Sequence, residues 1–107
     1  MLEPYVKLEI ENQVGYIEFF HPEHNAMPSD NLKKLEQIIL DAGKNDAIKV
    51  IVLKSGGDRT FCAGASFKEL IAIDDAATGK HFFSGFANVI NAMRKCSKLI
   101  IGRVQGK

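Results

Sequence analysis

A continuous apolar run at residues 50–53, mostly β-branched, is the feature that most constrains how this 107-residue chain can fold. Such a run is typical of a strand that is covered on both faces, as in a parallel sheet. A glycine-containing loop at residues 55–58 follows, and beyond a segment of small side chains the pattern becomes helical. A strand followed in this way by a helix predicts an α/β fold with right-handed crossover connections.

The rest of the chain fits this fold class. The hydrophobic patterns predict two strands, a helix, a strand, two helices and a strand, over residues 6–10, 14–20, 28–43, 50–53, 67–73, 78–94 and 99–104. A tight turn is expected between the first two strands. In the first helix, Pro28 suits the first turn, and Ser29 and Asp30 suit its cap. Gly43 is expected to end that helix.

The segment of small side chains at residues 62–66 leaves its backbone accessible. None of these residues is proline, so every N–H remains a possible donor, and Gly64 allows close approach of a ligand. If a helix begins at Ser66, the N–H of Ala65 points outward near the positive end of the helix dipole, where a negative charge is held. The Ala65 N–H is therefore a candidate oxyanion donor. A tight strand-to-helix connection, in which Ala and Gly merely permit packing, is the alternative.

Three charged residues flank this segment. Arg59 precedes it and Lys68 lies in the first turn of the expected helix, so both are candidates to bind a phosphate. Solvated surface charge is the alternative for both. Glu69 is a candidate acid or base, although its position on a helix is equally consistent with pointing at solvent.

Cys62 is a candidate nucleophile if His21, His24 or His81 serves as its base. Nothing local supports such a pair, and a small packed side chain is the alternative for Cys62. His21 and His24 have no zinc-ligand spacing and no cluster of carboxylates beside them. No metal site is therefore expected.

Composition narrows the choice of partners and compartment. The 14 Lys and Arg against 13 Asp and Glu give a formal net charge of +1, with no basic stretch that would favour nucleic acid. No secretory signal and no run of about 20 apolar residues is present, so neither export nor a membrane span is expected. Cys62 and Cys96 form no C-x-x-C pair, which favours a reducing, cytoplasmic setting.

Three segments together resemble the enoyl-CoA hydratase/isomerase family, the crotonase superfamily. They are Asn25-Ala26-Met27 before the first helix, residues 48–53 as a strand, and the stretch at residues 61–70. The resemblance covers essentially the whole chain. It implies a spiral of ββα units and an acyl-CoA thioester substrate, with coenzyme A entering only as part of that substrate and no other cofactor. It also implies a two-donor oxyanion hole that stabilises an enolate.

The same resemblance implies roles for individual residues. By motif position, Ala65 supplies the first oxyanion N–H. The other substrate-lining or CoA-binding positions are His24, Ala26, Arg59, Ala63, Ser66, Phe67 and Lys68. Among these, Arg59 and Lys68 fall where the family's basic residues meet the CoA phosphates, and Ser66 stands where Asp is commoner. Pro22 and Asn25 fall in the scaffold.

Residues 1–107 are expected to be the N-terminal part of a crotonase-like domain that is truncated here. The family's second oxyanion donor and its acid/base carboxylates would follow Lys107. The intact parent then resembles a hydratase or isomerase, a lyase-type enzyme of fatty-acid or branched amino-acid breakdown that forms trimers or pairs of trimers. This chain alone is predicted to be inactive. A non-catalytic CoA-binding or assembly fragment, a hydrolase or decarboxylase of the same family, and a Cys62 thiol enzyme are the alternatives.

Overall fold

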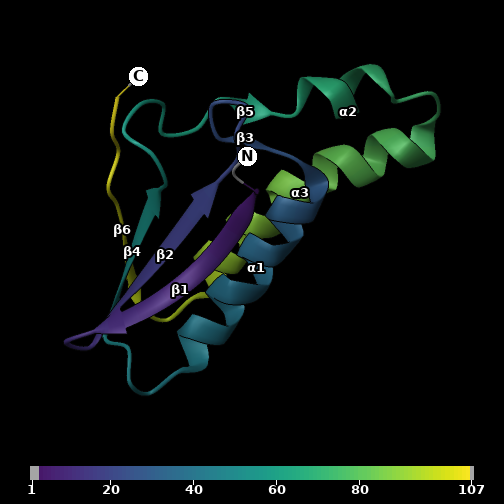
Figure 1. The fold of residues 1–107 in the computed structure, drawn as a ribbon. Coiled ribbons are helices and arrows are strands. Elements are labelled where there is room, and N and C mark those ends of the chain that lie inside the picture. Colours follow the sequence, from purple (N-terminus) through teal and green to yellow (C-terminus); the bar gives the residue numbers. More distant parts are fainter. Residues whose placement is uncertain (1–2, 107) are drawn as a thin grey trace.

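A sheet with two helices packed on one face forms the frame of the molecule (Figure 1). The computed structural model describes residues 3–106. The elements in chain order are β1 (Tyr5–Glu11), β2 (Val14–Phe20), β3 (Ala26–Met27), α1 (Ser29–Lys44), β4 (Val50–Ser55), β5 (Gly64–Ala65), α2 (Phe67–Ile71), α3 (Ala76–Lys95) and β6 (Leu99–Gly102). The expected strands and helices are all found, and β3 and β5 are additional.

The main sheet has the strand order β1-β2-β4-β6. Strands β1 and β2 are antiparallel, and their turn residues Asn12 and Gln13 both have positive φ angles, of 51° and 67°. Two such residues give the twist that a two-residue hairpin needs, which confirms the predicted tight turn. Strand β4 lies between β2 and β6 and runs parallel to both, as predicted.

The core lies between this sheet and helices α1 and α3. Alternation along β2 turns Ile17 and Phe19 toward the helices, and Ile51 of β4 joins them. On the helices, apolar residues at three- and four-residue spacing face the sheet: Leu32, Leu35, Ile39, Ala42, Val89 and Ala92. The expectation that both faces of β4 are covered holds only in part, because Val52 on the opposite face is half-buried.

Several predicted boundaries are wrong, and local hydrogen bonds explain two of them. Helix α1 continues past Gly43 to Lys44, where the amide of Asn45 closes the last turn on the Ala42 carbonyl. Helix α3 begins before Thr78, because the Asp75 side chain accepts from the Thr78 amide at 2.8 Å in a capping box. Helix α2 and strand β6 each end two residues earlier than expected, at Ile71 and Gly102.

The cap predicted for helix α1 is also wrong. Pro28 occupies the N-cap position, and neither Ser29 nor Asp30 caps the helix with its own side chain. Both residues lie within the first turn instead. The first turn is completed by a residue remote in sequence, as described below.

The short strands β3 and β5 form a separate parallel pair beyond the main sheet. Ala26 is in register with Gly64, and Met27 is in register with Ala65. Figure 1 shows this pair above the ends toward which β2 and β4 run, with α2 extending outward from β5. The small-residue segment therefore lies at the carboxyl edge of the parallel strands.

Candidate functional site

Two loops meet at the carboxyl edge of the sheet. One follows β2 and includes residues 21–25, and the other follows β4 and includes residues 56–63. Because β2 and β4 are parallel neighbours, the segments after them emerge side by side. This edge is where open α/β sheets commonly bind ligands.

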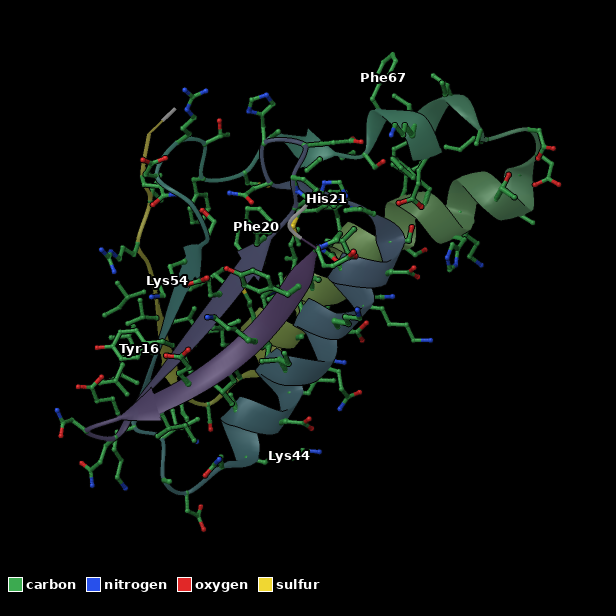
Figure 2. The ribbon with its side chains drawn as sticks, viewed as in Figure 1. Tyr16, Phe20, His21, Lys44, Lys54 and Phe67 are labelled. Carbon is green, nitrogen blue, oxygen red and sulfur yellow. The ribbon has the colours of Figure 1, made fainter. Side chains whose placement is uncertain are left out.

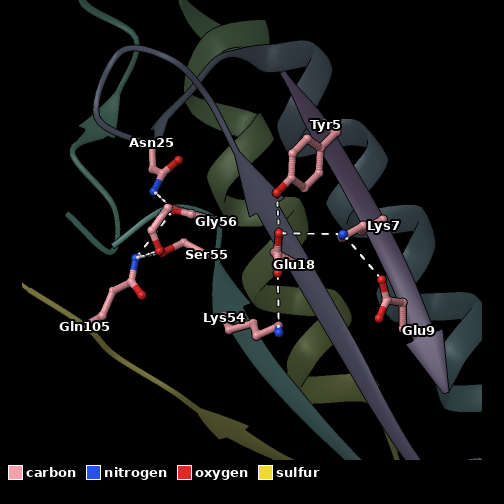
Figure 3. A network of polar contacts seen from close by, with 10 residues as sticks. Tyr5, Lys7, Glu9, Glu18, Asn25, Lys54, Ser55, Gly56 and Gln105 are labelled. Atoms are coloured by element: carbon pink, nitrogen blue, oxygen red, sulfur yellow. Dashed lines mark hydrogen bonds and ion pairs between the residues drawn. The ribbon is translucent and has the colours of Figure 1, made fainter. Parts of the chain in front are cut away.

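Asn25 joins these two loops. Its side chain is buried, and its Nδ2 donates to the carbonyl oxygen of Gly56 at 3.0 Å (Figure 3). The same Nδ2 donates to the carbonyl oxygen of Thr60 at 2.8 Å. Its Oδ1 accepts from the His21 amide at 2.9 Å, and its backbone oxygen accepts from the Ala63 amide at 3.3 Å. The positive φ of Asn25, 59°, lets the side chain fold back toward both loops. The scaffold position implied for Asn25 agrees with these bonds.

Ala65 lies at the end of β5, immediately before helix α2. Its side chain is exposed, whereas Met27, its partner in register, is buried. Ser66 is buried and caps α2, because its Oγ accepts from the Glu69 amide at 3.4 Å. Since α2 spans only five residues, its dipole adds little to anion binding, and an anion at Ala65 would depend on the N–H of Ala65 itself.

The structure places other predicted site residues around the β3–β5 pair. Ala26 is buried within β3, while Ala63 is exposed and precedes β5. Phe67 is 70% exposed and projects away from the sheet (Figure 2). The small residues are therefore brought together at one edge, and Phe67 points outward from them.

His24 and Arg59 line one hollow of about 260 Å³ between the two loops. Asn25 and Asp58 also line it. The hollow thus combines imidazole, guanidinium and carboxylate groups within a small space. His24 and Arg59, which were both predicted to bind CoA, are exposed.

Lys68 is engaged by a carboxylate of the first loop. Its Nζ lies 2.8 Å from Glu23 Oε1. The hydrogen bond from Lys68 lowers the pKa of Glu23, and the same bond raises the pKa of Lys68. The Lys68 side chain is 80% exposed and that of Glu23 is 43% exposed, so solvent screens the pair and it contributes little to stability. A phosphate at Lys68 would have to compete with Glu23.

Glu69 has both carboxylate oxygens occupied by Ser29. Its Oε1 accepts from the Ser29 amide at 2.5 Å and its Oε2 accepts from the Ser29 hydroxyl at 2.6 Å. Sequence patterns did not indicate this contact. Glu69 also lines a cavity of about 350 Å³ between α2 and α3, together with Ile73, His81 and Phe82.

The suggested thiol and imidazole groups take part in local contacts. Cys62 is half-buried, packs against the core, and its Sγ accepts from the Gly64 amide at 3.4 Å. His21 Nδ1 accepts from the Glu23 amide at 3.0 Å. These contacts fit small packed groups better than a nucleophile and its base, and the thiol hypothesis stays a prediction.

A row of alternating charges crosses the sheet on the face opposite the helices (Figure 3). Lys7, Glu18 and Lys54 are neighbours in register on β1, β2 and β4, and the Tyr5 hydroxyl donates to Glu18. Burial of Tyr5, followed by its bond to Glu18, raises the Tyr5 pKa to about 12. Burial acts to raise the pKa of Glu18, but hydrogen bonds from Tyr5 and Lys54 and the nearby lysine charges outweigh it and lower that pKa.

Among residues 3–106, no helix has the length and apolar character that crossing a bilayer requires. The same residues contain no group of three or more His, Cys, Asp or Glu placed to hold a metal ion.

Comparisons with known proteins agree on one family. A family model described as enoyl-CoA hydratase/isomerase matches residues 9–107. A (7aS)-7a-methyl-1,5-dioxo-2,3,5,6,7,7a-hexahydro-1H-indene-carboxyl-CoA hydrolase of Rhodococcus jostii is 33% identical over 86 residues, 80% of this chain and 33% of that protein. A short-chain-enoyl-CoA hydratase of Clostridium acetobutylicum is 26% identical over 102 residues, 94% of this chain and 39% of that protein.

Solved structures show the same fold. DspI of Pseudomonas aeruginosa is 26% identical with a TM-score of 0.86, and the match covers 94% of this chain and 38% of that one. An enoyl-CoA hydratase of Mycobacterium smegmatis is 23% identical with a TM-score of 0.86, covering 95% and 40%. The chain spans 33% to 40% of the length of these four proteins. The expected fold is confirmed, and the chain belongs to the enoyl-CoA hydratase/isomerase family, the crotonase superfamily.

Proposed function

We propose that the intact protein acts on an acyl-CoA thioester, as a hydratase or isomerase, and that the Ala65 N–H is one donor of its oxyanion hole. The observation that carries this proposal is the position of Ala65. It is exposed at the end of β5, on the carboxyl edge of the parallel strands, in a segment that Asn25 holds through Ala63. Relatives named as a short-chain-enoyl-CoA hydratase and as a carboxyl-CoA hydrolase support the substrate class.

The chemistry assigned to Ala65 is stabilisation of an enolate. When water adds to an enoyl thioester, or a proton leaves the α-carbon, an electron pair moves onto the thioester oxygen. An N–H already aimed at that oxygen stabilises the growing charge, and losing one such donor costs about 3–4 kcal/mol of barrier lowering. The small side chains of Ala63 and Ala65 let the carbonyl approach the backbone. Acid and base roles are not assigned to residues of this chain.

The coenzyme A part of the substrate would lie along the two loops. His24 and Arg59 share one hollow, and Arg59 supplies a positive charge suited to a phosphate. Lys68 would add a second charge after exchanging Glu23 for the phosphate. Ala26, Ser66 and Phe67 complete the proposed lining. No metal or further cofactor enters this scheme.

The first experiment follows the Ala65 amide resonance while crotonyl-CoA or free CoA is added to the labelled chain. We expect the resonance to shift with crotonyl-CoA and to stay unchanged with free CoA, because only the thioester carries the accepting oxygen. Arg59→Met should weaken binding of both ligands, whereas the matched variant Arg103→Met should not. If the Ala65 amide resonance does not shift when crotonyl-CoA binds, the proposed donor role of Ala65 is refuted.

The activity of residues 1–107 alone is a separate proposal. We expect no hydration of crotonyl-CoA above a buffer control, measured as loss of the enoyl-thioester absorbance, because one donor without a positioned acid and base is insufficient. Measurable turnover would contradict this. The intact parent is proposed to be a cytoplasmic homo-oligomer, a trimer or hexamer, which sedimentation of that longer protein would test.

A non-catalytic CoA-binding or assembly fragment is the second candidate. The observation in its favour is that the chain spans only 33% to 40% of the length of its relatives. Binding of CoA and crotonyl-CoA with equal affinity, without response at Ala65, would support this candidate over the first.

A further inference from the structure

The carboxylate of Glu69 caps the N-terminus of helix α1 from outside that helix. Helix α1 leaves the N–H groups of its first turn without partners within the helix, and its N-cap residue, Pro28, has no side chain that accepts. Glu69 accepts from both the amide and the hydroxyl of Ser29, at 2.5 and 2.6 Å. A negative charge here also faces the positive end of the α1 dipole.

This cap connects two elements that the proposed site needs in fixed relation. Glu69 lies on α2, four residues beyond Ala65, whereas Ser29 begins α1 two residues after the end of β3. On the other side of Ala65, the Ala63 amide donates to the Asn25 carbonyl. The segment that carries the Ala65 N–H is thus held at both ends.

We infer that Glu69 is a positioning residue for the Ala65 amide. This inference rests on the oxyanion role proposed for Ala65. Both oxygens of Glu69 are occupied by Ser29, so the carboxylate is engaged in holding α2 against α1 and is not a free acid or base. Loss of the Ser29–Glu69 hydrogen bonds lets α2 move relative to α1, and the Ala65 N–H, which lies just before α2, moves with it.

The inference predicts a coupled change in two amide signals of the free chain. In Glu69→Gln, which keeps the length of the side chain but removes its charge, the Ser29 amide should exchange with solvent about tenfold faster or more. The Ala65 amide resonance should move at the same time. Ser29→Ala should produce a smaller displacement in the same direction, and Ser29→Thr, which retains the hydroxyl, should match the unmodified chain.

Glu36→Gln is the matched control, because Glu36 is also half-buried and lies in the middle of α1. It should leave both amides unchanged. If Glu69→Gln releases the Ser29 amide while the Ala65 resonance stays in place, Glu69 is only a cap and the inference is wrong. If Glu69→Gln fails to fold, the Ala65 resonance of Ser29→Ala decides in the same way whether the contact positions Ala65.

Ligand binding separates this inference from the proposed function. In Glu69→Gln, we expect the preference for crotonyl-CoA over free CoA to fall about tenfold while the Kd for free CoA is unchanged. A general loss of stability would weaken the binding of both ligands alike. If the unmodified chain shows no preference for crotonyl-CoA, the oxyanion role fails, yet the two amide signals in the free chain still decide whether Glu69 positions Ala65.

Discussion

Replacing Asn25 by Asp tests whether this one side chain holds the two loops together. The substitution preserves shape and tolerance of a positive φ. It replaces the Nδ2 donor with an oxygen that faces the carbonyl oxygens of Gly56 and Thr60, which lie 3.0 and 2.8 Å from Nδ2 in the structure. One buried and one partly buried hydrogen bond are lost, and both carbonyl oxygens then face the new carboxylate oxygen.

The magnitude follows from these contacts. Each lost bond costs about 1 kcal/mol, and leaving buried acceptors unpaired raises the total to about 2–4 kcal/mol of unfolding free energy at pH 7. Burial beside two carbonyl oxygens raises the pKa of the introduced carboxyl group. Its protonated form can donate one bond, so the destabilisation should shrink as the pH falls toward 4.

Urea unfolding followed by circular dichroism at pH 7 and at pH 4 measures both effects. Asn88→Asp is the matched control, because Asn88 is exposed on α3 and the same change there should stay within about 0.5 kcal/mol. A loss below about 1 kcal/mol at pH 7 for Asn25→Asp would refute the argument, as would a penalty that does not change with pH.

Two substitutions and one labelling experiment have definite expected outcomes. The pKa of Glu18 is lowered in the folded chain, so the stabilisation that its carboxylate gives the fold is present above the ordinary Glu pKa and is lost as the pH falls. The free energies of unfolding of the unmodified chain and of Glu18→Gln, obtained from unfolding curves, should therefore differ at pH 7 and converge in acid. Lys98→Met keeps the apolar stem but removes the ammonium that donates to the carbonyls of Ala42 and Asn45, and urea unfolding should show a loss of about 1–2 kcal/mol. Iodoacetamide should label Cys62 slowly at neutral pH in a mass-spectrometric time course, and rapid labelling would revive the thiol hypothesis.

The sequence pattern was sufficient for the main strands and helices because their signals are local. The period-two alternation of β2 and the apolar spacing of α1 both follow directly from which faces are buried. The β3–β5 pair has only two residues in each strand, too few for any periodicity, and it exists because Ala26 and Gly64 meet in three dimensions. Family motifs marked the same residues but not their pairing.

The helix ends and the polar contacts of the site were predicted less well for a related reason. Capping rules consider residues adjacent to a helix, and they assigned Ser29 to the N-terminal cap of α1. The structure instead uses Glu69, separated by 40 positions, so no local window contains the pair. Asn25 was placed in the scaffold by resemblance alone, and its bonds to Gly56 and Thr60 likewise depend on tertiary structure.

Charged side chains that are remote in sequence contact helix α1 at both of its ends. Glu69 supplies a negative group at its N-terminus, and Lys98 supplies a positive group at the carbonyls of its C-terminus. Each sign opposes the helix dipole at that end, so both contacts are favourable and would be unfavourable if the charges were exchanged. Because Glu69 belongs to α2 and Lys98 precedes β6, α1 becomes a fixed reference for the segments that flank it. The position of Ala65 therefore depends on the packing of α1 as well as on its own loop.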